Sequence, residues 1–158
     1  MVAFALVLAA ALAACPALAL SLVQRPAGAR PRAVTASTIS VQETAQLRLV
    51  SRHGTEVLNE RGEGSGTFHC PITARLITAY TRASIAFTIA CSSKNTLSGA
   101  GEASFYVSGS TAHFSGTVAV TRGTGLYAHD SATSLKLSGT YQRNSYALVM
   151  YVSGRMRT

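Results

Sequence analysis

Few residues in this chain combine the types and the spacing that acid–base chemistry needs. His129 and Asp130 are adjacent and follow a glycine-rich turn, which makes them the first candidates for a general base and a carboxylate partner. Adjacent residues in an extended chain point to opposite sides, so these two side chains cannot form a dyad with each other. The pattern favours a solvated loop over a catalytic pair at this point.

The other titratable side chains are scattered. Glu102 lies in a strand-like stretch, but its phase is opposite to that of the apolar residues Phe105 and Val107, so it should face solvent and is a weak catalytic candidate. An acidic cluster falls in residues 52–63, which we interpret as a polar loop without the spacing of a calcium-binding EF-hand: Glu56, Glu60 and Glu63.

Motifs for metals, cofactors and nucleophilic serines are not found in the sequence. The four histidines share no metal-ligand spacing, and no serine lies in a G-x-S-x-G turn. We therefore predict neither a metal site nor a cofactor, and we expect any function to depend on shape rather than on a reactive motif.

The elements that would position these residues are β-strands. From residue 38 onward, short stretches alternate apolar and small polar residues, as in FSGTVAVTRGTGLYAH at 114–129. No helical period appears after the N-terminal segment. Five Ser-Gly pairs recur within these stretches, where we expect strands to coil sharply or another backbone to come close. The strand pattern predicts an all-β fold, either a sandwich or a barrel, and these glycines favour a closed antiparallel barrel of about eight strands over a flat sandwich.

The inward phase of these strands is almost wholly apolar. It includes the aromatic and methionine side chains that we expect to line the barrel interior: Phe68, Phe87, Phe105, Phe114, Tyr141 and Met150. A barrel filled by side chains and a barrel with a small apolar pocket would give the same sequence pattern. On the outward phase, apolar residues suggest a covered face such as an oligomer interface: Ile77, Tyr106, Val149 and Tyr151.

Cys70 and Cys91 are the only cysteines in the predicted barrel. If Thr81-Arg82 forms a two-residue turn, antiparallel pairing places Cys91 opposite Ile72, and a bulge at Cys70-Pro71 would bring the two sulfur atoms together. We predict a disulfide between Cys70 and Cys91, with two buried free thiols as the alternative.

The N-terminal segment has the composition of an export signal. Residues 1–19 are almost wholly apolar and end in Ala17-Leu18-Ala19, which fits a cleavage site. An alternative is a lipobox ending at Cys15, in which case that cysteine would carry a lipid and hold the protein at a membrane. Residues 20–37 are expected to be a disordered basic linker, and residues 38–158 the barrel domain. The predicted location is secreted or in the cell envelope.

The chain carries a formal net charge of +8, and only 13% of its residues are charged. Arg25, Arg30 and Arg32 form a basic group before the first predicted strand. No nucleic-acid-binding motif accompanies them, so we expect a solubilising arm and no specific nucleic-acid partner.

The region Phe114–Thr140 resembles the allene oxide cyclase and dirigent β-barrel superfamily. The matching residues are Phe114-Ser115-Gly116, the turn Gly123-Thr124-Gly125 followed by Leu126-Tyr127, and Ser138-Gly139-Thr140. The barrel region is also similar to small secreted bacterial proteins of this type without an assigned activity.

The resemblance implies an eight-stranded barrel that can form a dimer or trimer. Relatives bind apolar or phenolic molecules in the barrel and cyclise them or steer radical coupling, using carboxylates and other polar groups inside it. No such group can be matched here by motif; Gly123, Gly125 and Tyr127 match as turn-forming and packing residues.

Three functions fit these observations. The first is a secreted, non-enzymatic barrel that binds a small apolar ligand or a partner surface. The second is an isomerase or cyclase of the allene oxide cyclase or dirigent type. The third is an envelope-associated structural protein whose basic arm binds anionic polymers. Polar side chains that point into a real cavity would favour the second function over the first.

Overall fold

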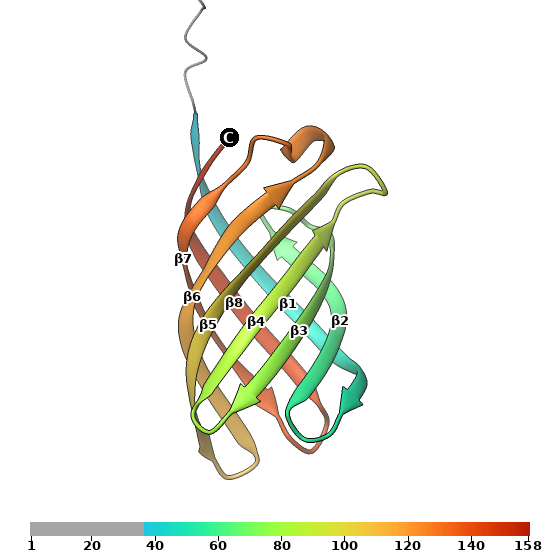
Figure 1. Cartoon of the computed structure of the whole chain (residues 1–158), viewed down its shortest axis with the longest axis vertical. Helices are drawn as coiled ribbons and strands as arrows, with labels where there is room; N and C mark the ends of the chain where they lie inside the picture. Colours follow the sequence, from blue (N-terminus) through green and yellow to red (C-terminus); the bar gives the residue numbers. More distant parts are fainter. Residues whose placement is uncertain (1–36) are drawn as a thin grey trace, which may run out of the picture. The chain divides into compact units, whose positions relative to one another are not determined.

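The computed structural model describes residues 37–158 (Figure 1). The predicted signal peptide, the Cys15 lipobox, the basic group Arg25–Arg32 and nearly all of the linker lie outside the described residues. The described part contains eight strands, β1 (Thr38–His53), β2 (Val57–Gly66), β3 (Pro71–Ala79), β4 (Arg82–Ala90), β5 (Thr96–Ser108), β6 (Thr111–Gly123), β7 (Ala132–Gln142) and β8 (Ala147–Arg157).

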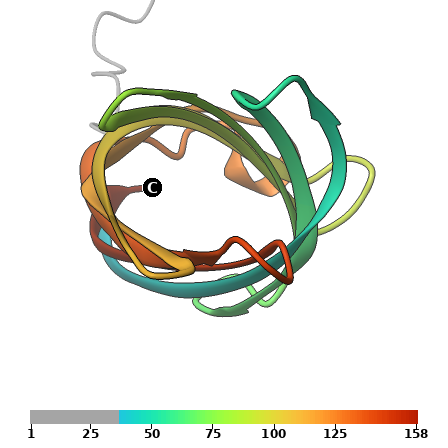
Figure 2. The ribbon, with the colours of Figure 1, turned by 90° about the horizontal axis from the view of Figure 1, so that it is seen from below.

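These strands form one closed antiparallel barrel. Each strand pairs with the next in the sequence, and β1 closes the ring by pairing with β8 from Thr38↔Arg157 to Arg48↔Ala147 (Figure 2). The predicted all-β barrel of eight strands is therefore confirmed. The one helical turn in residues 37–158 is the 3-10 turn η1 (Gly125–Tyr127), and no helix there is long and apolar enough to cross a membrane.

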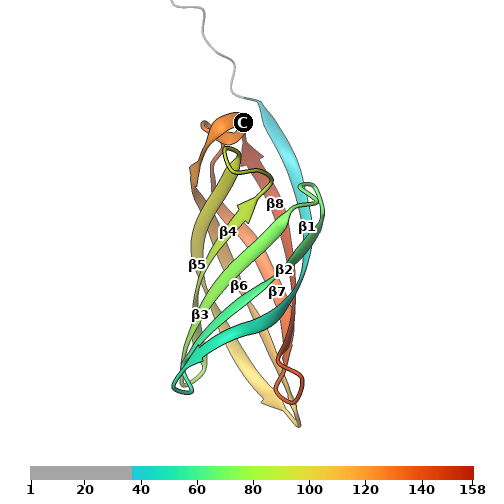
Figure 3. The ribbon, with the colours of Figure 1, turned by 90° about the vertical axis from the view of Figure 1, so that its right-hand side faces the viewer.

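The two ends of the barrel differ in their connections (Figure 3). At one end, called here the loop end, lie the β2–β3, β4–β5 and β6–β7 loops, together with the start of β1 and the end of β8. At the opposite end, the turn end, four short turns join the strands, at 54–56, 80–81, 109–110 and 143–146. Short turns leave the turn end open, whereas the loops have enough residues to cover the loop end.

The segment predicted as a polar loop, residues 52–63, is largely strand β2. Its inward positions are Leu58, Glu60, Gly62 and Gly64, so apolar residues do not alternate along it and the usual strand signal is missing. Pairing on both sides makes it a strand nevertheless, with Glu60 opposite Leu49 on β1 and Ala74 on β3. This correction moves Glu60 from a solvated loop into the wall of the barrel.

The glycines of the Ser-Gly pairs lie where backbones come close, as predicted: Gly66, Gly99, Gly116, Gly139 and Gly154. At the first four, an added Cβ atom would meet the backbone oxygen of a residue on the neighbouring strand. At Gly154 it would meet the side chain of Leu135 at 2.8 Å. Strands that tilt and coil around a small barrel leave no room for a side chain at such points.

The disulfide between Cys70 and Cys91 is present, but the register differs from the one predicted. The β3–β4 turn is Tyr80-Thr81, so Ile72 pairs with Ile89 instead of Cys91. Continuing this register two residues further places Cys70 directly opposite Cys91, with their Cα atoms 4.9 Å apart. No bulge at Pro71 is needed, and Pro71 is the first residue of β3, where its missing N–H costs little.

Candidate ligand pocket inside the barrel

The loop-end half of the barrel interior is nearly filled by side chains. The space left there is a cavity of about 40 Å³. Three of the six residues predicted to line the interior surround it, Phe68, Phe87 and Met150, together with Ile89 and Leu97. About 10–15 Å³ of such space suffices for one water molecule, so this cavity could hold a few waters and is too small for an organic ligand.

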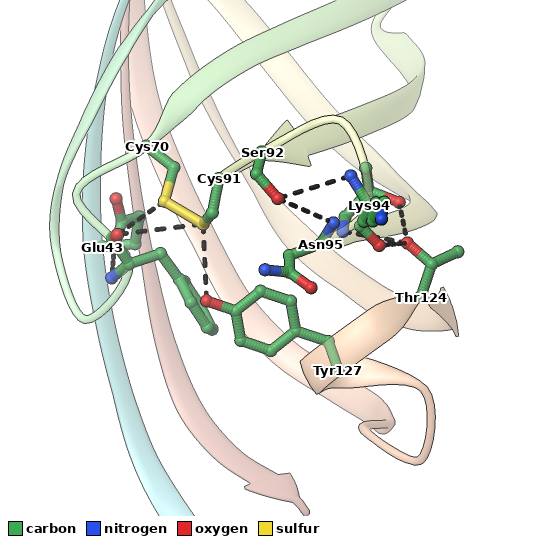
Figure 4. Close-up of a disulfide and its surroundings, with 10 residues drawn as sticks. Glu43, Cys70, Cys91, Ser92, Lys94, Asn95, Thr124 and Tyr127 are labelled. Carbon is green, nitrogen blue, oxygen red and sulfur yellow. Dashed lines mark hydrogen bonds between the residues drawn. A yellow bond between two sulfur atoms is a disulfide. The ribbon is translucent and has the colours of Figure 1, made fainter.

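The loop end is closed by aromatic side chains tied to the disulfide (Figure 4). Phe68, from the β2–β3 loop, meets Tyr127 edge to face with ring centroids 5.9 Å apart. The Tyr127 hydroxyl lies 3.4 Å from the Cys91 sulfur. Because Cys91 is bonded to Cys70 in the same loop as Phe68, the three loops of this end are held together above the cavity.

The Gly123-Thr124-Gly125 turn presents Tyr127 to this cap. The Thr124 hydroxyl donates to the Lys94 carbonyl at 2.8 Å, and the Asn95 side-chain oxygen accepts from the Leu126 amide at 3.1 Å. Gly125 has φ of +60°, and a Cβ there would meet the Asn95 side chain, so a residue without a side chain is required. The motif that carries the family resemblance therefore positions an aromatic side chain and contributes no reactive group.

A carboxylate lies beneath the cap. Glu43, on β1, is 6% exposed, and its Oε2 accepts a hydrogen bond from the Phe68 amide at 3.0 Å. Its Oε1 is buried and has no partner among the described residues. Gly64 on β2 leaves the space for this carboxylate, because a Cβ at Gly64 would collide with Oε1. Glu43 thus anchors the β2–β3 loop from inside the barrel.

The turn-end half of the interior contains an open pocket of about 300 Å³. The other three predicted interior residues line it, Phe105, Phe114 and Tyr141, together with Leu58 and Leu76. Pockets for small organic ligands start at about this volume and are mainly apolar with a few polar groups. The six side chains predicted to line one interior are therefore divided between a nearly filled cavity and an open pocket.

Polar residues surround the mouth of this pocket. Arg52 and Arg143, both exposed, line a wider outer recess of about 630 Å³ with Asn144 and Tyr146. The recess adjoins the inner pocket, because four residues line both of them: Thr55, Leu58, Tyr141 and Arg143. The order from solvent inward is a basic rim, a tyrosine, and an apolar chamber.

Glu60 lies just beyond the apolar lining of the pocket. Leu58 and Leu76 are a cross-strand pair in that lining, and the next inward pair along the same two strands is Glu60 and Ala74. Glu60 is 2% exposed, and neither carboxylate oxygen has a hydrogen-bond partner among the described residues. Burial raises the pKa of Glu60 from its ordinary value of 4.5 to about 7.

Tyr141 connects Glu60 with the pocket. Burial, followed by the nearby Glu60 and Tyr146, raises the pKa of Tyr141 to about 12, while Arg52 acts in the opposite direction. The phenol therefore remains a neutral hydrogen-bond donor at any physiological pH. Tyr141 therefore places a hydroxyl in the wall of a mainly apolar pocket, and the carboxyl group of Glu60 lies one residue pair beyond that lining.

The catalytic candidates taken from the sequence are far less enclosed. Glu102 is exposed on the outer face of β5. His129 is exposed in the β6–β7 loop at the loop end, and Asp130 next to it is half-buried. Burial raises the pKa of Asp130, and the adjacent His129 lowers it. None of the three lines either interior space.

Sequence reasoning missed the two buried carboxylates, Glu43 and Glu60. Glu43 shares its phase along β1 with Val41 and Leu47, so the alternation of these apolar residues is a signal that could have placed it inside. Glu60 gave no such signal, because its strand was interpreted as a loop.

No group of three or more potential metal ligands occurs in residues 37–158. Comparisons of the chain with models of protein families, with curated proteins and with solved structures found no match.

Proposed function

We propose that the barrel binds a small, mainly apolar molecule in its turn-end pocket, with the polar part of that molecule directed at Glu60 and Tyr141. The observation that carries this proposal is the isolation of Glu60, a carboxyl group that is almost completely buried and has no hydrogen-bond partner within residues 37–158. An unpaired buried polar group costs roughly 1–3 kcal/mol, and more if charged, so such a group commonly has a role beyond folding.

The pocket geometry supports a ligand of limited size. The chamber of about 300 Å³ is open at the turn end and closed inward by the filled half of the barrel. Its aromatic walls, Phe105 and Phe114, offer contact area to a ring or a short hydrocarbon chain. A hydroxyl or amide on such a molecule would supply the hydrogen bond that Glu60 lacks.

A pocket-filling substitution tests this proposal. Ala112 is half-buried and lines the pocket, so Ala112→Phe should fill it and weaken binding of the neutral apolar fluorophore N-phenyl-1-naphthylamine at least about tenfold. Ala86 is exposed on the outer face of β4, and Ala86→Phe should leave binding unchanged. Fluorescence titration of the two variants is the measurement. Equal affinity in both, or no saturable binding by the wild type, would reject the proposal.

A second candidate function is catalysis in the same pocket, of the allene oxide cyclase or dirigent type. The supporting observation is again Glu60, because a carboxyl group with a pKa of about 7 can accept and release a proton near neutral pH. Tyr141 would orient the substrate through its hydroxyl. This function requires all the properties of a binding pocket and, in addition, proton transfer or control of stereochemistry.

The variant Glu60→Gln distinguishes binding from catalysis, because it keeps the shape of the side chain and removes its ionisable proton. If the barrel directs radical coupling, a phenol oxidised by a one-electron oxidant should give enantiomerically enriched dimers with the wild type and racemic dimers with Glu60→Gln. Chiral chromatography measures this ratio. Racemic product with both proteins, combined with intact fluorophore binding, would leave simple ligand binding as the function.

We also propose that the protein works outside the cytoplasm. The Cys70–Cys91 disulfide supports this location, since such bonds persist in oxidising compartments. Recovery of the protein from the cytosol of its source cells with both thiols free would contradict it.

A further inference from the structure

On the outer wall of the barrel, away from the pocket, three arginines lie on three adjacent strands. We propose that this arginine patch, Arg48 on β1, Arg61 on β2 and Arg75 on β3, binds an anionic polysaccharide. The site is separate from the ligand pocket, because the three arginine side chains point outward from the barrel wall and none of them lines the pocket.

The strand register places the three side chains together. Arg48 and Arg61 are direct cross-strand partners, and Arg75 is paired with Asn59, two residues from Arg61 on β2. All three arginines are exposed. Their sequence neighbours Leu47, Glu60 and Ala74 are buried inside the barrel, so alternation turns each arginine outward.

Such an arrangement is unfavourable without an anion. Like charges directly opposite each other in a sheet destabilise it. Two exposed carboxylates lie near the three guanidinium groups: Glu63 on β2, opposite Gln46, and Glu102 on β5, which lines an outer recess together with Arg75. Two of the other acids, Glu43 and Glu60, are buried in the barrel and do not balance the outer charge.

The surface next to the arginines carries hydroxyl and amide side chains that can hydrogen-bond to a sugar chain. A groove of about 460 Å³ runs over β2–β4, and Arg61 and Arg75 line it together with Asn59, Thr73 and Thr88. Adjacent strands are about 4.8 Å apart, so the patch spans about 10 Å across three strands and can contact more than one anionic group of one polymer. Guanidinium groups bind sulfate, phosphate and carboxylate through paired hydrogen bonds, and the hydroxyl and amide groups match sugar hydroxyls.

These features favour a polysaccharide over a nucleic acid. Phe87, the aromatic residue at the groove, points into the barrel and lines the internal cavity, so it offers no surface for base stacking. The patch lies on the convex wall of a barrel and has no helix or protruding ribbon that could enter a DNA groove.

Binding of heparin, a sulfated polysaccharide, to the full chain is the test. The triple variant Arg48→Gln, Arg61→Gln, Arg75→Gln should raise the dissociation constant for heparin about tenfold at 150 mM NaCl, as expected for three exposed charge contacts. The control variant Lys136→Gln, Arg155→Gln, Arg157→Gln changes three exposed cations on β7 and β8 and should raise it less than threefold. Both variants lose the same charge and retain Arg25, Arg30 and Arg32.

Equal losses in the two triple variants would overturn the proposal, because they would show that net charge alone determines binding. Tighter binding of a DNA duplex or of phosphatidylserine vesicles than of heparin, with the same dependence on the patch, would replace the polysaccharide by that partner. Circular dichroism melting of each variant verifies folding. The single variant Arg48→Gln, which removes one of the two opposed charges, repeats the heparin test with a smaller change to the protein. The fluorophore should bind normally to the patch variant, so failure here is distinct from failure at the pocket.

Discussion

The free energy of unfolding is expected to fall by about 3 kcal/mol between pH 4 and pH 8 because of Glu60 alone. Its pKa is 4.5 in the unfolded chain and about 7 in the barrel. Each unit of difference corresponds to 1.36 kcal/mol, which sets the size of the effect. No other carboxyl group in the described residues is so deeply buried with so few hydrogen-bond partners.

The direction follows from proton binding in the two states. Below about pH 4.5 Glu60 is protonated in both, and its ionisation does not affect stability. Between about pH 4.5 and 7 the unfolded chain has lost the proton while the folded protein keeps it, so stability falls as the pH rises. Above about pH 7 the carboxylate is charged in both states, and the folded protein carries the full cost of its desolvation.

Urea denaturation of wild type and Glu60→Gln across this range is the measurement. The difference in unfolding free energy between them should change by about 3 kcal/mol, with the variant relatively more stable at pH 8 than at pH 4. Taking the difference removes contributions that both share, such as that of Asp130. Glu102→Gln, at an exposed position, should show almost no pH-dependent difference. A constant difference between wild type and Glu60→Gln would show that the carboxyl is solvated or paired.

Removal of the disulfide should also lower stability by about 3 kcal/mol. Cys70 and Cys91 are 21 residues apart in the sequence, and closing a loop of this length restricts the unfolded chain by about that amount. The double variant Cys70→Ala, Cys91→Ala should therefore unfold at a clearly lower urea concentration than the wild type. The loss should affect the loop end most, where the bond supports the contact between Phe68 and Tyr127.

Reduction provides the control for this second prediction. Dithiothreitol should lower the unfolding midpoint of the wild type to near that of the double variant and have no effect on the variant itself. A wild type that is indifferent to dithiothreitol, despite complete reduction measured by thiol titration, would mean that the bond adds nothing to stability. Binding of the fluorophore should change little in either case, because the pocket is at the turn end.

The strands that were recognised from the sequence share a clear alternation. In β6, Phe114, Gly116, Val118 and Val120 occupy one phase, and closely spaced hairpins leave few topologies for such segments. The Cys70–Cys91 pairing was predicted although the assumed turn was one residue late, because both cysteines share the inward phase of adjacent strands. Local patterns therefore predicted the sheet even where the register was wrong.

Alternation, turn residues and Ser-Gly pairs are local signals, and they were enough to predict the class of fold, to favour a closed barrel and to suggest the bond between its cysteines. Which carboxylates lie inside depends on how the strands pair in three dimensions. Glu60 faces inward because its strand pairs on both sides, with Leu49 and Ala74, and no local preference would bury a carboxyl. The division of the interior into a filled half and an open pocket depends likewise on how side chains from all eight strands meet. This packing depends on contacts between residues far apart in the sequence, which no short segment encodes.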